Sequence, residues 1–124
     1  MNHHFSNKLF PSTAPFSHFV SDNNLGFISG IIAQGPLSGE LVNFDFEQQV
    51  RQTLDNFSIL LAELKLDKSN VLRTCIYVTN YDHFSLLNEI YSSYFTAPFP
   101  ARTTLAVAGL PLGAKIQIDA IVRL

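Results

Sequence analysis

The chain has 124 residues, which fits one domain built around a single hydrophobic core. Hydrophobic residues make up 47% and charged residues 15% of it, a composition that excludes a disordered chain. Eight basic and ten acidic residues give a net charge of −2. Because the basic residues are spread singly, the sequence lacks the positive patch of a nucleic-acid-binding or membrane-surface protein.

The N-terminal third of the chain predicts an arm, a hairpin and a loop. Residues 1–13 are polar with scattered aromatic residues, so we expect an irregular arm. It has no apolar stretch of the kind found in secretory signals, which favours a cytoplasmic location. Two β-leaning segments, Phe16–Ser21 and Leu25–Ser29, flank the turn Asp22–Asn24 and predict a β-hairpin. Three glycines and a proline then indicate a loop over Gly30–Glu40.

An amphipathic helix is predicted over Asp45–Lys65. Its apolar residues recur at spacings of three and four residues, which places them on one face of the helix. Asp45 followed by Gln48 resembles a capping box, in which two side chains satisfy free N–H groups at the helix start. The apolar face consists of Phe46, Val50, Leu54, Phe57, Leu61 and Leu64.

The second half of the chain alternates strands with one more helix. Val71–Thr79 is rich in β-branched and aromatic residues and predicts a strand. A second amphipathic helix is predicted over Asp82–Phe95, and two further strands over Arg102–Ala108 and Lys115–Val122. The order β-β-α-β-α-β-β predicts one α+β domain over residues 1–124, with a mixed sheet and both helices on one face. The other sheet face must then be polar or meet a partner.

Six motifs in a fixed order point to a known family. The clearest is Phe-Pro-Ala-Arg-Thr-Thr at 99–104, followed by Leu-Pro at 110–111 and Lys-Ile-Gln-Ile-Asp-Ala at 115–120. Together they resemble the RidA/YjgF family over the chain from about residue 14 onward. The other five motifs lie at Ala14–His18, Phe27–Gly30, Ser38–Glu40, Gln49–Asn56 and Asp82–Tyr91.

The resemblance implies a fold, an assembly and an activity. The fold is the chorismate-mutase-like α+β fold, assembled as a homotrimer with a barrel-like core and ligand clefts between the subunits. The activity is hydrolysis of reactive 2-imino or enamine acids, such as 2-iminobutanoate and 2-iminopropanoate, to a 2-keto acid and ammonia. The partner is therefore a small imino or keto acid, with no cofactor, nucleic acid or membrane involved.

Arg102 and Gln117 are the predicted catalytic residues. The guanidinium of Arg102 is a rigid fork that matches a carboxylate, and holding the carboxylate of a 2-imino acid would place the neighbouring carbon for attack by water. Gln117 stands where many members of the family carry a Glu. A Gln can hold a water by hydrogen bonds, but it cannot take the proton of that water as a base.

Five further residues are predicted to bind substrate because of the resemblance, namely Phe16, Ser29, Gly30, Asn88 and Thr104. Gly30 has no Cβ, so its backbone can approach a small ligand closely. Phe16 replaces the usual Tyr, and Thr104 stands where some members have Cys. Simpler roles remain open for three of them: Gly30 as a turn glycine, Ser29 as the end of the hairpin and Asn88 as an exposed helix residue.

The sequence offers no other catalytic centre. His3 and His4 have no third ligand at a metal-binding spacing, so no metal site is predicted. Cys75 is the only cysteine, which excludes an internal disulfide framework, and we interpret it as a small core residue. No stretch approaches the roughly 20 apolar residues of a membrane-spanning helix.

Three functions stay open at this point. The first is the imine deaminase. The second is a RidA-like protein that binds small carboxylates or metabolites with little turnover, because Gln117 replaces the usual Glu. The third is the RNA cleavage once associated with this family, against which the net charge of −2 argues.

Overall fold

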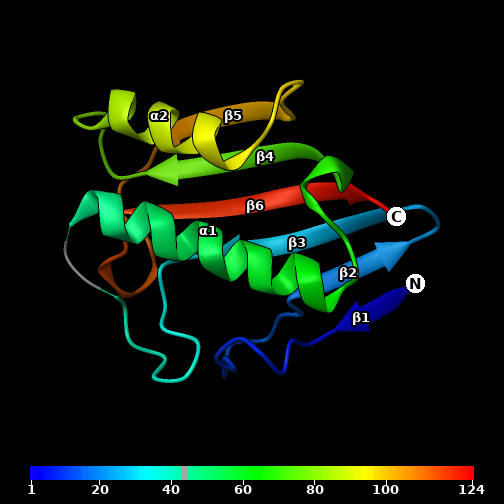
Figure 1. The fold of residues 1–124 in the computed structure, drawn as a ribbon. Coiled ribbons are helices and arrows are strands. Elements are labelled where there is room, and N and C mark those ends of the chain that lie inside the picture. Colours follow the sequence, from blue (N-terminus) through cyan, green and yellow to red (C-terminus); the bar gives the residue numbers. More distant parts are fainter. Residues whose placement is uncertain (43–44) are drawn as a thin grey trace.

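The computed structural model describes residues 1–42 and 45–124, and in this part of the chain it forms a six-stranded sheet with two helices across one face (Figure 1). The α+β class and the placement of both helices are therefore confirmed. The strands are β1 (Asn2–His4), β2 (Phe19–Asp22), β3 (Leu25–Ile31), β4 (Val71–Val78), β5 (Ala101–Ala106) and β6 (Ile116–Arg123). The helices are α1 (Phe46–Glu63) and α2 (Phe84–Tyr94), with short 3-10 turns at Lys68–Asn70 and Pro111–Gly113.

The strands follow the order β1-β2-β3-β6-β4-β5 across the sheet. All neighbouring strands are antiparallel except β4 and β5, which run parallel. A parallel pair needs a long crossover, and α2 supplies it between these two strands. This connection places β5 at one edge of the sheet and packs α2 beside it.

Two of our expectations for the N-terminal half need correction. The arm is not irregular throughout, because Asn2–His4 forms β1 and pairs with β2, whose edge would otherwise be unpaired. Three polar residues carry no periodicity that would reveal such a strand. The loop expected from Gly30 begins later, since β3 runs to Ile31 with an irregularity in its pairing between Ile28 and Ile31.

Helix α1 covers the centre of the sheet with the face that its spacing predicted. Asp45 caps the helix, and its side chain accepts a hydrogen bond of 2.7 Å from the backbone N–H of Glu47. Val50 and Phe57 are fully buried against the sheet. The helix ends at Glu63, and Lys65 follows it in the left-handed region with φ 59°.

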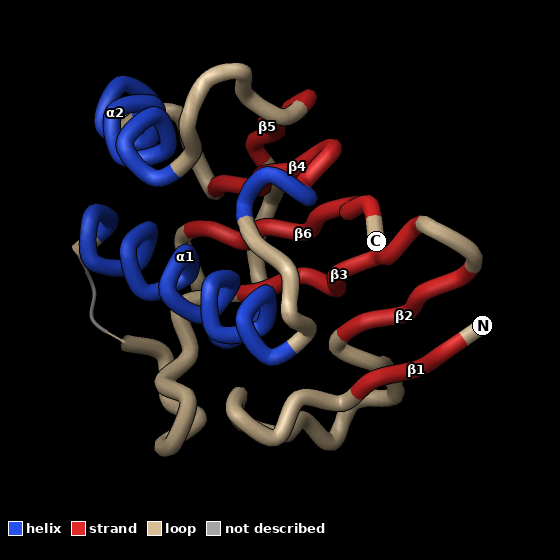
Figure 2. Tube along the Cα trace, turned by 45° about the vertical axis from the view of Figure 1, so that its right-hand side comes forward, coloured by secondary structure: helices blue, strands red, loops and turns tan. Residues whose placement is uncertain are grey.

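The two faces of the sheet differ, as Figure 2 shows with both helices on one side of the strands. In β6 the residues Ile116, Ile118, Ala120 and Val122 are buried under the helices, whereas Gln117, Asp119 and Ile121 alternate with them and face the other way. No helix in the described residues covers this second face, which we call the open face. Large apolar side chains are exposed there, including Phe27 at 45% and Leu105 at 49%.

The expectation that Cys75 is a core residue is wrong. Cys75 is a free cysteine of intermediate exposure, and it alternates along β4 with the buried Thr74 and Ile76. Its neighbours across the strands are Thr103 and Asp119, so it lies on the open face. Its small size and apolar surroundings in the sequence suggested the core, but the strand register decides its side.

Candidate functional site

Arg102 lies on edge strand β5, on the helix side of the sheet. Its partner across the parallel strands is Thr74, which is fully buried and whose Oγ1 is 2.7 Å from the hydroxyl of Tyr91 on α2. The guanidinium carbon of Arg102 lies 4.7 Å from the centre of the Tyr91 ring and 5.7 Å from that of Phe84. The guanidinium therefore lies against the aromatic face of α2.

Two nitrogens of the Arg102 guanidinium are in contrasting situations. Nε donates a hydrogen bond of 2.8 Å to Oγ1 of Thr104, whereas Nη2 is buried without a hydrogen-bond partner. Burial lowers the pKa of Arg102 from its ordinary value, although the side chain stays charged because that value is so high. A buried cationic N–H with no acceptor is costly, so this position suits an anionic ligand.

Two other predicted site residues belong to this side of the sheet: Thr104, which contacts Arg102, and Asn88, which lies on the neighbouring helix α2. Asn88 stands four residues after Phe84 and three before Tyr91, and this helical spacing puts all three on the face of α2 beside Arg102. Thr104 touches Arg102 directly through its hydroxyl. We refer to Arg102, Thr104 and Asn88 as the arginine half-site.

The remaining predicted residues gather on the open face, around Gly30 and Gln117. A Cβ added to Gly30 would lie 2.6 Å from Nε2 of Gln117, so the missing side chain makes room for that amide. The hydroxyl of Ser29 donates a hydrogen bond of 2.6 Å to the backbone oxygen of Ser17, which ties β3 to the segment before β2. We refer to Phe16, Ser29, Gly30 and Gln117 as the glutamine half-site.

A groove of about 910 Å³ opens over the glutamine half-site. All four residues of this half-site line it, together with Asp119, Ile121 and the arm residues from Leu9 to Ala14. Asp119 accepts a hydrogen bond of 3.0 Å from the hydroxyl of Tyr77. This bond, together with burial and the charge of Asp119, raises the pKa of Tyr77 to about 12. The carboxylate of Asp119 is therefore already engaged within the sheet.

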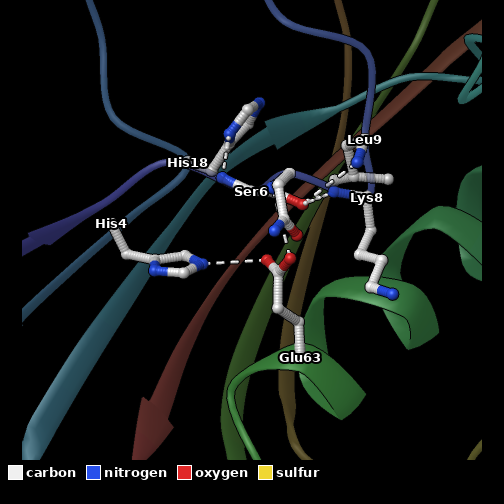
Figure 3. A network of polar contacts seen from close by, with 7 residues as sticks. His4, Ser6, Lys8, Leu9, His18 and Glu63 are labelled. Carbon is white, nitrogen blue, oxygen red and sulfur yellow. Dashed lines mark hydrogen bonds and ion pairs between the residues drawn. The ribbon is translucent and has the colours of Figure 1, made fainter.

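A polar network fixes the arm that borders this groove (Figure 3). The backbone N–H of Ser6 donates 2.9 Å to Nδ1 of His18, and Glu63 at the end of α1 accepts 2.8 Å from His4 and 3.2 Å from the N–H of Asn7. Burial lowers the pKa of His18. Burial also raises the pKa of Glu63, but hydrogen bonds from His4, Ser6 and Asn7 outweigh it, so this pKa lies below its ordinary value.

The structure does not bring the two predicted catalytic residues together within one chain. Arg102 faces the helices from edge strand β5, whereas Gln117 faces the open side from β6, and β4 lies between the two strands. Each half-site is assembled locally, but the two are on opposite faces of the sheet. One chain therefore presents both half-sites without joining them.

Tyr91 and Phe84 are contacts of the candidate site that the sequence analysis missed. Both belong to the apolar face of α2, which the sequence predicts as an amphipathic helix without assigning these two residues to the site. Their positions around Asn88 at helical spacing were the available signal, because a residue predicted to bind ligand has its helical neighbours on the same face.

Within the described residues, no group of three or more His, Cys, Asp or Glu is placed to hold a metal ion. No helix in that part of the chain is long and apolar enough to cross a membrane.

Comparisons with known proteins show which proteins this chain is similar to. The family model described as Endoribonuclease L-PSP matches residues 6–124. Reactive Intermediate Deaminase A, chloroplastic, from Arabidopsis thaliana is 42% identical over 110 residues, which cover 89% of this chain and 59% of the longer plant protein. The 2-iminobutanoate/2-iminopropanoate deaminase of Homo sapiens is 36% identical over 107 residues, covering 86% of this chain and 78% of the human protein.

A solved structure extends the likeness to the whole fold. The YjgF gene product of E. coli matches with a TM-score of 0.91 at 31% identity, covering 99% of this chain and 98% of that one. The matched region contains both half-sites and all the strands from β2 to β6. The chain belongs to the RidA/YjgF family, the family that the Endoribonuclease L-PSP model describes.

Proposed function

We propose that this protein hydrolyses reactive 2-imino or enamine acids of the 2-iminobutanoate and 2-iminopropanoate type to the 2-keto acid and ammonia. The observation that carries the proposal is the buried Nη2 of Arg102, a cationic donor without a partner beside a face of α2 that also bears Asn88. A 2-imino acid offers the matching carboxylate one bond away from the carbon that water must attack. Family membership and relatives named as imine deaminases support the same activity.

The proposed reaction needs only positioning and proton transfer. Arg102 pairs with the substrate carboxylate, and the Gln117 amide holds a water against C2. The water oxygen bonds to C2 while its proton passes to the basic imine nitrogen, since Gln117 cannot accept it. The resulting carbinolamine then loses ammonia as its hydroxyl proton moves to the nitrogen, which leaves the 2-keto acid. No cofactor enters this balance.

We propose further that the site is completed between chains of a homotrimer with a barrel-like core. Arg102 and Gln117 lie on opposite faces of one sheet, so a single substrate can meet both only if they come from neighbouring chains. The arginine half-site of one chain would then face the glutamine half-site of the next. The exposed Phe27 and Leu105 on the open face support burial of this face against other copies.

A second candidate is a binding protein for small carboxylates, and Gln117 favours it. No carboxylate stands at this position to activate water, and the nearby Asp119 is engaged by Tyr77. The arginine half-site would still bind a 2-keto or 2-imino acid. Such a protein would bind its ligand in a saturable manner without increasing the rate of hydrolysis.

Imine hydrolysis in competition with semicarbazide separates the two candidates. An amino-acid oxidase generates 2-iminobutanoate or 2-iminopropanoate in place, and the protein is expected to lower the yield of semicarbazone. Arg102→Ala is expected to abolish this effect, Gln117→Glu to increase it, and the surface variant Arg51→Ala to leave it unchanged. If the wild type does not lower the yield of semicarbazone but binds 2-ketobutyrate in a saturable manner by calorimetry, the binding protein is favoured. If the wild type shows no hydrolysis and no binding, both candidates are overturned.

The cytoplasmic location stays a prediction from the sequence.

A further inference from the structure

The orientation of the Arg102 guanidinium decides how a carboxylate can approach it. An arginine has two bidentate edges, the side edge formed by Nε and one Nη and the end edge formed by the two Nη groups. In this structure Nε is committed to Oγ1 of Thr104 at 2.8 Å. Nη2 belongs to both edges and has no partner. Because Nε is already engaged by Thr104, the end edge is the one left for a bidentate ligand.

The guanidinium is also held by the ring of Tyr91. The guanidinium carbon lies 4.7 Å from the centre of this ring, and Tyr91 is itself only 4% exposed. Its hydroxyl is 2.7 Å from Oγ1 of Thr74, a fully buried residue of β4. Because both ends of this ring are fixed, it forms a rigid platform under Arg102.

These contacts together leave the long Arg102 side chain little freedom. The hydrogen bond to Thr104 restrains the rotation of the guanidinium, and the Tyr91 ring supports the guanidinium carbon from one side. A free arginine side chain would lose rotamer entropy when it binds a ligand, whereas a side chain already held in place loses less. The hydroxyl of Thr104 thus has a use that does not require it to touch substrate.

We propose that Thr104 and Tyr91 are positioning residues that hold Arg102 so that it takes the substrate carboxylate through its end edge. This inference rests on the proposed function, because it assumes that Arg102 binds a carboxylate. It assigns Thr104 a role through Arg102 in addition to the direct substrate contact expected from the resemblance. It implies that this chain needs an acceptor at position 104, since a side chain without one would release Nε.

The test compares Thr104→Val, which keeps the shape of the side chain and removes the acceptor, with Thr104→Ser, which keeps the acceptor. Thr104→Val is expected to weaken binding of 2-ketobutyrate by about tenfold and to raise the KM for the imine by a similar factor, because a hydrogen bond that organises a charged group is lost. Thr104→Ser is expected to restore most of both. Thr96→Val, an exposed threonine after α2, is the matched control and should behave like the wild type.

A readout without substrate keeps this inference separate from the proposed function. Nitrogen-15 NMR should show an Arg102 Nε–H that exchanges slowly in the wild type and in Thr104→Ser, and rapidly in Thr104→Val. Equal exchange in the wild type and Thr104→Val would overturn the positioning role, whether or not the protein is a deaminase. A second outcome is that slow exchange is lost only in Thr104→Val, while the wild type neither binds 2-ketobutyrate nor hydrolyses imines. This outcome would confirm the contact between Thr104 and Arg102, but it would overturn both the end-edge binding of a carboxylate and the proposed function.

Discussion

Two buried threonines show how much the partner of a polar group matters. Thr53 on α1 and Thr74 on β4 are both fully buried. The hydroxyl of Thr53 has no hydrogen-bond partner, whereas that of Thr74 is paired with Tyr91. A buried hydroxyl without a partner costs free energy, and a paired one leaves its partner unsatisfied when it is removed.

The same substitution at these two positions should therefore have opposite effects. Thr53→Val is expected to raise the free energy of unfolding by up to about 1 kcal/mol, because it removes an unpaired hydroxyl without changing the shape. Thr74→Val is expected to lower it by about 1–2 kcal/mol, since the Tyr91 hydroxyl is left buried without a partner. Denaturant unfolding of both variants measures this, and equal losses of stability would contradict the assignment.

His18 should make the anchoring of the arm dependent on pH. Burial lowers the pKa of His18; the charge of Glu63 opposes this shift and that of His4 adds to it. Nδ1 of His18 can accept the hydrogen bond from the Ser6 N–H only when this nitrogen is unprotonated. Because the folded chain binds this proton less readily than the unfolded chain, the stabilisation is complete above the ordinary pKa of about 6.5 and is lost as the pH falls below it. Because the pKa of Glu63 is also lowered, the folded chain loses further stability as the pH falls through the range in which Glu63 becomes protonated.

The melting temperature should therefore fall from about pH 7 to about pH 5. His18→Gln is the matched control, since a Gln oxygen can accept the same N–H but does not titrate in this range. The variant is expected to lose less stability over this interval than the wild type. An identical decrease in both proteins would show that His18 is not the titrating group.

At the level of strands and helices, the sequence shows the spacing of apolar residues but not the register in which the strands pair. The spacing of apolar residues along α1 was enough to predict which of its residues face the core. Nothing in the sequence of β5 showed that Arg102 faces the helices, because its side follows from pairing with Thr74 in a parallel register. The half-sites were thus predictable as residues, whereas their placement on opposite faces required the structure.

The close approach of β3 and β6 allows a test at the element scale. Gly30→Ala would place a Cβ 2.6 Å from the Gln117 amide and push that side chain away, at little cost in stability because the amide ends a flexible chain. We expect imine hydrolysis to fall about tenfold as the water-holding group is displaced. Gly109→Ala meets nothing within 4 Å and is the matched control. Full activity of Gly30→Ala would argue against a role of Gln117.

At the scale of the whole molecule, the placement of the two half-sites on opposite faces of the sheet is the central feature. In the site that we propose, the arginine half-site at the edge of one sheet is completed by the glutamine half-site on the open face of another copy. The exposed apolar residues of the open face fit the same arrangement. In a closed ring of identical chains, every half-site meets its complement.

Mixing two inactive variants tests this account most directly. Arg102→Ala disables one half-site, and Gly30→Val disables the other by filling the space beside Gln117. After equal amounts are unfolded, mixed and refolded, random assembly should pair an intact arginine half-site with an intact glutamine half-site at about a quarter of the interfaces, with that share of wild-type imine hydrolysis. Each variant refolded alone should stay inactive. A mixture that forms oligomers of both chains and yet remains inactive would contradict a site shared between chains.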